Sequence, residues 1–310
     1  MDIIGIIMAA GKSSVDVALY TLIPVMVVML IIMRFLEHKG VLAVFVNFMS
    51  PLLKPFGLTG MAVFALIQLN LVSFAAPLAA LAIMEKQGTS DRHLAAALAM
   101  LFTMGQGNVF YPLIPWGLNW SAALVISVLG GLVASAITYH LTGRKLSISR
   151  NRDYESDEVN KVKNAGIIQI INSAGVDAIK LALGSVPMLI LSLTVVGLLQ
   201  SAGVINTIVH LSSPLLSYFD ISEVYIMPAL TKILAGGTAY YGVISDLLKH
   251  GAISSQQINA SAGFMIQTLD LPGVGILLGI SGKFVRLFRF ALPGAVLGIL
   301  IRGVIHAMMF

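Results

Sequence analysis

Cysteine is absent from this 310-residue chain, which excludes disulfide bonds, thiol catalysis and cysteine-ligated metals. Charged residues are also scarce, at 11% of the chain against about 25% in a typical soluble protein. Apolar residues make up 57%, and the mean hydropathy is +0.92. A soluble core cannot bury so many apolar side chains, so lipid must surround part of the chain. The same composition argues against intrinsic disorder.

Because charged residues are scarce, the sequence contains long runs without any of them. The longest, residues 94–143, holds 50 residues without Asp, Glu, Lys or Arg, which is enough for two crossings at about 20 residues each. The N-terminal segment lacks the basic region of a signal peptide, so we interpret it as mature protein. We assign the net charge of +5 to cytoplasmic loops and not to binding of nucleic acid. The sequence predicts a multi-pass protein of the bacterial inner membrane.

The chain contains an internal repeat with a constant offset of 163 residues. The equivalent positions are Pro24 and Pro187, Leu30 and Leu193, Leu36 and Leu199, Gly40 and Gly203, Ser50 and Ser213, Phe56 and Phe219, and Gly88 and Gly251. A fixed offset held over 64 residues indicates a duplication. We therefore predict a first repeat at 1–143, a charged cytoplasmic linker at 144–165 and a second repeat at 166–310.

Each repeat is predicted to contain a short segment ending in Ser-Pro-Leu-Leu between helix A and segment B, and five longer segments: an amphipathic lead-in helix, an apolar helix A, and segments B, C and D. They lie at 3–15, 17–36, 59–84, 94–116 and 119–141 in the first repeat, and at 167–176, 179–199, 223–248, 257–281 and 288–308 in the second. Asp16 and Asp177, beside helix A, are interpreted as helix caps. The spacing of Gly275 with Gly279, and of Gly294 with Gly298, favours close helix packing.

Segment B decides the topology. If B crosses the membrane, each repeat has four spans and the two repeats are parallel. If B is a re-entrant hairpin, each repeat has three spans and the second repeat is inverted. With the N-terminus outside, the inverted arrangement places fifteen of the nineteen Lys and Arg residues in the cytoplasm, as the positive-inside rule favours. We therefore predict an all-α fold of two inverted repeats, each with three spans, one re-entrant hairpin and a lead-in helix.

Polar residues, glycine and proline interrupt segment B at matching places in the two repeats. Backbone leaves a helix at membrane depth only where it is buried in protein or lines a wet cavity. Matching interruptions in inverted halves indicate the binding site of a transporter, and half-helix N-termini suit anionic or hydrogen-bonding solutes. The candidate site residues in segment B are Gln68, Asn70 and Ser73 in the first repeat, and Thr231, Lys232, Gly236, Gly237 and Thr238 in the second.

Segment C supplies four more candidates. The run Met104-Gly-Gln-Gly-Asn108 predicts a second break with Gln106 and Asn108 at the site, and the second repeat offers Gln267 and Asp270. A charge at the bilayer centre costs roughly 2.5 to 3.5 kcal/mol. We therefore expect Lys232 and Asp270 to face the shared interior, close to each other, with Asp270 as a proton-coupling carboxylate. The alternatives are interhelical hydrogen bonds for the amides and a structural ion pair for the charges.

Three stretches of the first half resemble a known family. Residues 13–24, the run Ser50-Pro-Leu-Leu-Lys-Pro-Phe-Gly57 and the run Ser73-Phe-Ala-Ala-Pro77 are similar to the Gate, or nucleoside recognition, family of bacterial membrane proteins. Its relatives include the spore maturation proteins A and B. The resemblance covers both halves and implies the architecture of concentrative nucleoside transporters, with inverted repeats and re-entrant hairpins. Because residues 72–76 carry no carboxylate, nucleoside stays one candidate solute among several.

The leading hypothesis is a secondary-transporter-like protein that moves a small polar solute, nucleoside-like or other, or an ion past a midplane site between the repeats. The alternatives are a non-transporting membrane scaffold or assembly factor, a lipid-linked precursor translocase and an intramembrane enzyme. The sequence has no phosphate loop, zinc motif or catalytic triad, so we predict no enzyme activity, cofactor or metal. The expected partners are membrane lipid and the solute or ion. Nucleic acid is not expected, and a homo-oligomer is left open.

Overall fold

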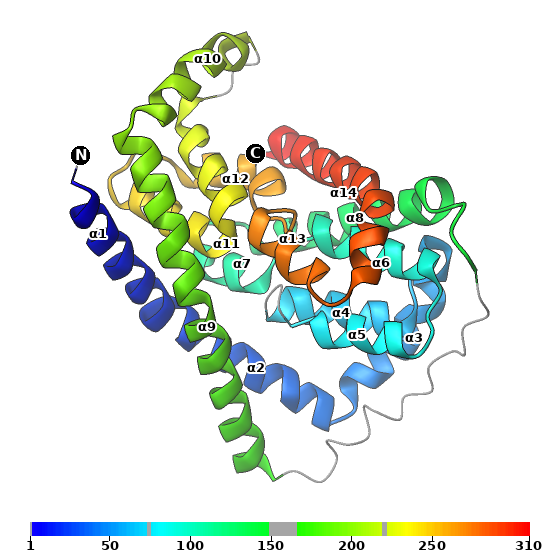
Figure 1. The fold of residues 1–310 in the computed structure, drawn as a ribbon. Helices are drawn as coiled ribbons and strands as arrows, with labels where there is room; N and C mark the ends of the chain where they lie inside the picture. Colours follow the sequence, from blue (N-terminus) through cyan, green and yellow to red (C-terminus); the bar gives the residue numbers. More distant parts are fainter. Residues whose placement is uncertain (1, 73–75, 149–165, 219–221) are drawn as a thin grey trace.

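The computed structural model describes residues 2–72, 76–148, 166–218 and 222–310. In these ranges the chain forms helices and no strands, which confirms the predicted all-α class (Figure 1). The candidate Ser73 and the linker from residue 149 onward lie outside the described residues.

The first half of the chain contains short and medium helices. They are α1 (Ile3–Asp16), the π-helical η1 (Val17–Leu22), α2 (Ile23–His38), α3 (Val41–Leu53), the 3-10 turn η2 (Lys54–Phe56), α4 (Gly60–Leu71), α5 (Leu78–Lys86), α6 (Asp91–Thr103), α7 (Gly107–Leu113), the 3-10 turn η3 (Ile114–Trp116), α8 (Trp120–Ile137) and the π-helical η4 (Thr138–Thr142). The second half contains α9 (Ile167–Ser201), α10 (Val204–Tyr218), the 3-10 turn η6 (Glu223–Tyr225), α11 (Ile226–Lys249), α12 (Ser255–Met265), α13 (Leu271–Leu278) and α14 (Gly282–Met309).

The helices follow one another in the same order in the two halves. A long apolar helix ends just before a left-handed glycine, Gly40 (φ 72°) in the first half and Gly203 (φ 74°) in the second. A second left-handed pair, Gly88 (φ 75°) and Gly251 (φ 67°), separates the broken segment B from segment C. Glycine is the residue that adopts this conformation without steric cost, so the equivalent glycines of the two halves have the same backbone conformation at matching places.

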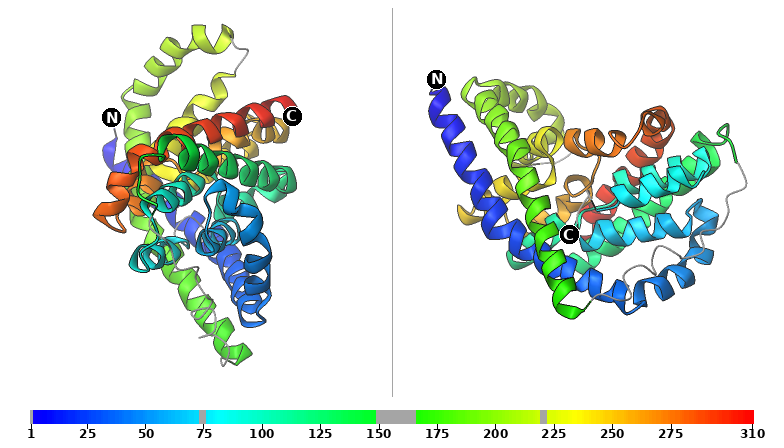
Figure 2. Two further views of the ribbon diagram at one scale, coloured as in Figure 1. Left: turned by 90° about the vertical axis from the view of Figure 1, so that its right-hand side faces the viewer. Right: turned by 60° about the horizontal axis from the view of Figure 1, so that its bottom comes forward.

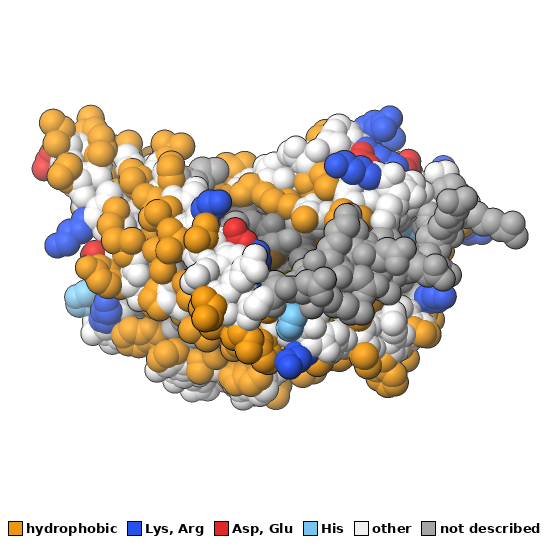
Figure 3. All heavy atoms as spheres, turned by 90° about the horizontal axis from the view of Figure 1, so that it is seen from below, with side chains coloured by type: hydrophobic (Ala, Val, Ile, Leu, Met, Phe, Trp, Pro, Cys, Tyr) orange, Lys and Arg blue, Asp and Glu red, His pale blue; other side chains and the backbone are white. Residues whose placement is uncertain are grey.

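Five helical stretches in the described ranges are long and apolar enough to cross a membrane. They are Ile3–His38, Asp91–Trp116, Trp120–Thr142, Ile167–Ser201 and Gly282–Met309. A further pair, Val41–Phe56 and Gly60–Leu71, is bent by 106° at its break. Hydrophobic side chains also cover much of the face shown in Figure 3. These helices support a multi-pass membrane protein.

The predicted lead-in helices are not separate elements. α9 runs unbroken for 35 residues, and α1, η1 and α2 form one continuous helical stretch. The capping role predicted for the two aspartates is also wrong, because no helix begins at either residue. Asp16 has α-helical backbone angles and no side-chain capping bond, whereas Asp177 lies inside α9 and pairs with Arg34 of α2. No Gly or Pro stands between Asp16 and Ile23 to end the helix.

Two groups of helices form the molecule. The long helix α9 crosses α1 and α2 and also contacts α10 and α11, whereas α6, α8, α12 and α14 pack against one another (Figures 1 and 2). Small residues allow α14 to approach α8 closely: a Cβ atom on Gly298 would lie 2.7 Å from the carbonyl oxygen of Gly130. A Cβ atom on Gly294 would lie 2.6 Å from that of Ala134. The predicted close packing is confirmed here but not at Gly275, where a Cβ atom would meet nothing within 4 Å.

Candidate functional site at the crossing of two broken helices

Segment C is broken in both halves. In the first half the break lies between α6 and α7, at residues 104–106, as the run from Met104 to Asn108 predicts. In the second half residues 266–270 separate α12 from α13, a break that the sequence analysis missed. Its local signal is Asp270, which caps α13, followed by Pro272 in the first turn. That pair is typical of a helix start.

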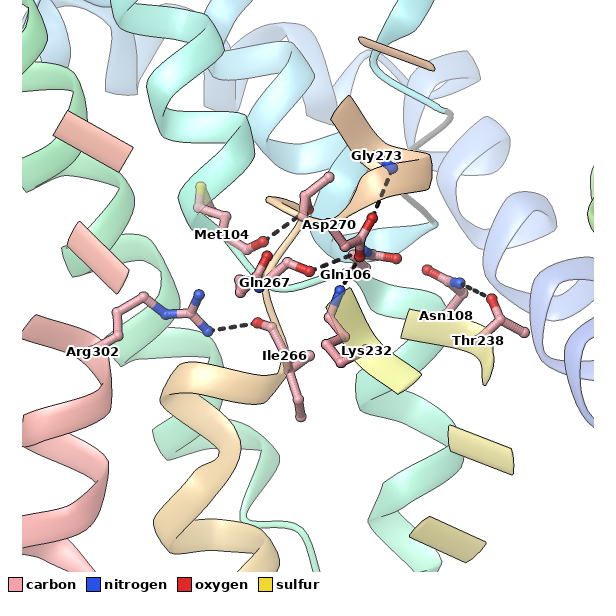
Figure 4. Close-up of polar contacts among 11 residues, drawn as sticks. Met104, Gln106, Asn108, Lys232, Thr238, Ile266, Gln267, Asp270, Gly273 and Arg302 are labelled. Atoms are coloured by element: carbon pink, nitrogen blue, oxygen red, sulfur yellow. Dashed lines mark hydrogen bonds and ion pairs between the residues drawn. The ribbon is translucent and has the colours of Figure 1, made fainter. Parts of the chain in front are cut away.

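The two breaks are hydrogen-bonded to each other (Figure 4). The Thr268 amide donates to the Phe102 carbonyl at 3.1 Å, and the Thr268 hydroxyl donates to the Met104 carbonyl at 3.0 Å. In the other direction the Gln106 amide nitrogen donates to the Gln267 carbonyl at 3.2 Å. Unwound backbone needs partners of this kind inside a membrane protein, because lipid supplies none. We call this contact between residues 104–106 and 266–270 the crossing.

The interruption predicted in segment B of the second repeat also lies at the crossing. Gly236 departs from helical geometry inside α11, with φ 84° and ψ −178°. A Cβ atom on Gly236 would lie 3.7 Å from both carboxylate oxygens of Asp270, and one on Gly237 would lie 3.3 Å from Oε1 of Gln106. The bend in α11 therefore packs against both breaks, and the absence of side chains at these two glycines permits the approach.

Lys232 and Asp270 form a buried ion pair. Their side chains are each 2% exposed, and Figure 4 shows the Lys232 ammonium pointing from α11 to the carboxylate. The other carboxylate oxygen of Asp270 accepts a hydrogen bond from the Gly273 amide at 2.7 Å, which caps α13. A carboxylate is stabilised at a helix N-terminus by the helix dipole as well as by its cation. The expected proximity of the two charges is present in the structure.

Asn108 and Thr238 join α7 to α11. The Asn108 amide nitrogen donates to the Thr238 hydroxyl at 3.4 Å, and both side chains are buried. Asn70, at the end of α4, also lies near α7, because its backbone carbonyl accepts a hydrogen bond from the Tyr111 hydroxyl at 3.0 Å. Gln68 lies two residues earlier on α4, so it points about 200° away from Asn70 around the helix. The structure therefore does not bring these two amides onto one face.

Several polar atoms of the predicted site residues are buried without a hydrogen-bond partner. In the described part of the chain they are the side-chain oxygens of Gln68, Asn70, Gln106, Asn108, Thr231 and Gln267. Five of them are amide oxygens, which only accept hydrogen bonds, and the sixth is a hydroxyl. Buried polar groups are normally paired, so such a group of unpaired acceptors calls for an explanation.

Arg302 and Thr268 bond to the crossing but are not among the predicted site residues. Arg302 of α14 donates to the carbonyls of Thr103 and Ile266, and Thr268 bonds the opposite break. Arg302 is visible in the sequence as a charge inside an apolar helix, but nothing local indicates what it contacts. Among the described residues, no group of three or more His, Asp or Glu side chains is placed to hold a metal ion.

Comparison with known proteins gives this geometry a context. Residues 19–114, from η1 to the start of η3, match the family model for Gate, which is described as nucleoside recognition. This stretch therefore resembles the Gate family. It lies within the predicted first repeat, and a search of curated proteins found no match to the chain.

Solved structures of the concentrative nucleoside transporter CNTnw share the fold of this chain. A CNTnw variant in an outward-facing state aligns with a TM-score of 0.68 and 18% identity, covering 94% of this chain and 75% of that one. CNTnw in an inward-facing substrate-bound state aligns with a TM-score of 0.67 and 16% identity, and the alignment covers 93% of this chain and 74% of that one. A CNTnw variant in an intermediate state aligns with a TM-score of 0.65 and 16% identity, and the alignment covers 93% of this chain and 76% of that one. These alignments show a common fold over almost the whole of this chain.

Proposed function

We propose that this protein binds a small polar solute at the crossing and carries it through the membrane. The observation that carries the proposal is the set of buried, unpaired acceptors on predicted site residues. An unsatisfied buried polar group costs about 1 to 3 kcal/mol, and a solute that donates hydrogen bonds to these oxygens removes that cost. A structural interior would instead have its polar groups satisfied in pairs, so these atoms favour transport over the scaffold alternative.

The chemistry of the acceptors favours a solute rich in N–H and O–H groups. Gln106 and Asn108 present unpaired amide oxygens beside the bend in α11, and Gln267 presents a third from the opposite break. A nucleoside offers ribose hydroxyls and base N–H groups that fit acceptors of this kind. The Gate match and the CNTnw fold support the same solute class.

Asp270 and Lys232 provide the titratable part of the proposed site. Asp270 lies against the bend in α11, Lys232 lies on α11 one turn before that bend, and each is buried. Intramembrane ionisable pairs commonly mark ion or proton pathways. In this proposal Asp270 accepts the coupling proton, and Lys232 balances its charge when the proton is absent.

The proposed architecture is a pair of inverted repeats at 1–143 and 166–310, with segment B as a re-entrant hairpin in each. The shared helix order and the left-handed glycines at matching positions support the duplication. The distribution of Lys and Arg supports the inversion. Half-helices that meet from opposite sides of such repeats would bring the breaks of segment C to one midplane site in the bacterial inner membrane.

The test measures equilibrium binding of uridine and adenosine to the purified protein in lipid nanodiscs. Gln106→Ala and Asn108→Ala should each weaken binding by about 5- to 10-fold, as expected for one lost hydrogen bond. The matched control is Gln256→Ala, which removes an exposed amide from α12 and should leave binding unchanged. Nucleoside uptake by proteoliposomes then tests transport.

Two results would contradict the proposal. One is binding that the Gln106→Ala and Asn108→Ala variants retain in full, which would place the solute elsewhere. The other is the absence of any nucleoside binding or uptake by a folded parent protein, which would favour a scaffold role.

A further inference from the structure

Arg302 is the largest of the fully buried side chains in the described part of the chain, at 1% exposure. It lies toward the C-terminal end of the apolar helix α14, and its side chain extends to the crossing (Figure 4). Among the described residues, the buried charged side chains at this place are two cations, Lys232 and Arg302, and one carboxylate, Asp270. Since Asp270 pairs with Lys232, the charge of Arg302 is balanced by something other than a carboxylate.

The groups that balance it are the ends of two helices. One guanidinium nitrogen donates to the carbonyl of Thr103, the last residue of α6. The second terminal nitrogen donates at 2.8 Å to the carbonyl of Ile266, which follows the last residue of α12. The C-terminal end of a helix carries a partial negative charge and unpaired carbonyls. A single guanidinium therefore neutralises two half-helix ends, one from each half of the chain.

The sequence around Arg302 leaves room for its side chain. A Cβ atom on Gly130 of α8 would overlap Cγ and Cδ of Arg302. A Cβ atom on Gly263 of α12 would overlap the backbone at Arg302 and lie 2.7 Å from the Gly303 nitrogen. Gly130 therefore leaves room for the Arg302 side chain, and Gly263 lets α12 approach the backbone of α14 at the same position.

The neighbouring carbonyls of the crossing also have donors from the chain itself. The Phe102 and Met104 carbonyls accept from Thr268, and the Gln267 carbonyl accepts from Gln106. In transporters with broken helices, unwound carbonyls and half-helix C-terminal ends are the groups that hold a coupling cation. Here the carbonyls of Thr103 and Ile266, at both C-terminal ends, are occupied by Arg302.

We propose that the guanidinium of Arg302 is the fixed cation of the crossing, occupying the position that an exchangeable metal cation would otherwise take. Arg302 is in this sense a positioning residue, because it holds the two breaks together without touching the solute. The consequence is that the crossing needs no sodium or potassium ion to stay assembled. The inference rests on the proposed function only in treating the crossing as a transporter site.

The test measures the thermal unfolding midpoint of the purified, solute-free protein in sodium, potassium and choline chloride at equal ionic strength. The parent should unfold at the same temperature in all three salts. Arg302→Ala should unfold about 5 °C or more lower, and low millimolar guanidinium should restore part of that loss, with sodium more effective than choline. Arg289→Ala, which removes an exposed arginine stacked on Phe290 of the same helix, is the matched control and should show neither effect.

A second pair of variants covers the case in which Arg302→Ala does not fold. A fixed-cation role predicts that Arg302→Lys is more stable than Arg302→Gln, because the lysine keeps the charge while the glutamine keeps only donors. Equal stability of these two variants would overturn the inference. So would a sodium-specific rise in the parent's midpoint, or an Arg302→Ala protein that no cation stabilises. Because no solute is present, these outcomes are independent of whether nucleosides bind.

Discussion

Lys232 and Asp270 are 38 residues apart in the sequence and form an ion pair in which each side chain is only 2% exposed. The pair joins α11, just before its bend, to the N-terminus of α13. It therefore fixes the bend against the break of segment C in the same half. A buried pair of this kind is costly to break, because removal of one partner leaves the other charge unpaired.

The ion pair makes a prediction about coupled variants. Asp270→Asn and Lys232→Met should each lower the free energy of unfolding by about 3 to 5 kcal/mol. The double variant should lose much less than the sum, because no charge is left unpaired. Asn at position 270 can still cap α13, so the loss reports the charge and not the cap. Denaturant unfolding in detergent measures all four proteins, and additive losses would show that the two side chains do not interact.

A second prediction concerns the bend at Gly236. Its backbone angles belong to a region that glycine alone occupies readily, and Pro272 lies 3.3 Å from the position of a Cβ atom. Gly236→Ala should lower the free energy of unfolding by about 1 to 3 kcal/mol and weaken solute binding. Gly184→Ala, in open space inside α9, is the control and should be neutral or stabilise by up to about 1 kcal/mol. Equal effects of the two changes would contradict a special role for the bend.

The close contact of α8 and α14 gives a third prediction. Gly298→Ala would place its Cβ atom 2.7 Å from the Gly130 carbonyl, so the two helices must separate. We expect a loss of about 1 to 3 kcal/mol in unfolding free energy. Gly275→Ala meets nothing within 4 Å and should cause no such loss. The thermal midpoints of the two variants measure the difference, and a Gly298→Ala protein as stable as the parent would show that the interface adjusts freely.

The inverted arrangement predicts which surfaces face each side of the membrane. Single cysteines can be introduced cleanly because the chain has none. Ser147→Cys, at the exposed start of the linker, should be protected from a membrane-impermeant thiol reagent in right-side-out vesicles. Asn206→Cys, exposed on α10, should be labelled. Labelling with the opposite pattern, or on both residues alike, would reject the predicted topology.

Much of the fold follows from local features of the sequence. Scarce charge and long apolar runs predict a helical membrane protein, because unpaired backbone cannot lie in lipid. The break before Asn108 and the bend at Gly236 were predicted from glycines clustered with polar residues inside apolar segments. The second break of segment C was missed because its signal, Asp270 with Pro272, lies inside a run that otherwise reads as apolar helix.

The partners of the polar residues came only from the tertiary structure. The sequence predicted that Lys232 and Asp270 lie close together in the interior, but it gave no contact for Arg302. That side chain reaches Thr103, which is 199 residues away in the sequence, through space left by Gly130. Asp177 likewise pairs with Arg34 instead of capping a helix. Local sequence sets where helices break, because backbone conformation depends on neighbouring residues, whereas the partner of a buried charge depends on which distant helices pack together.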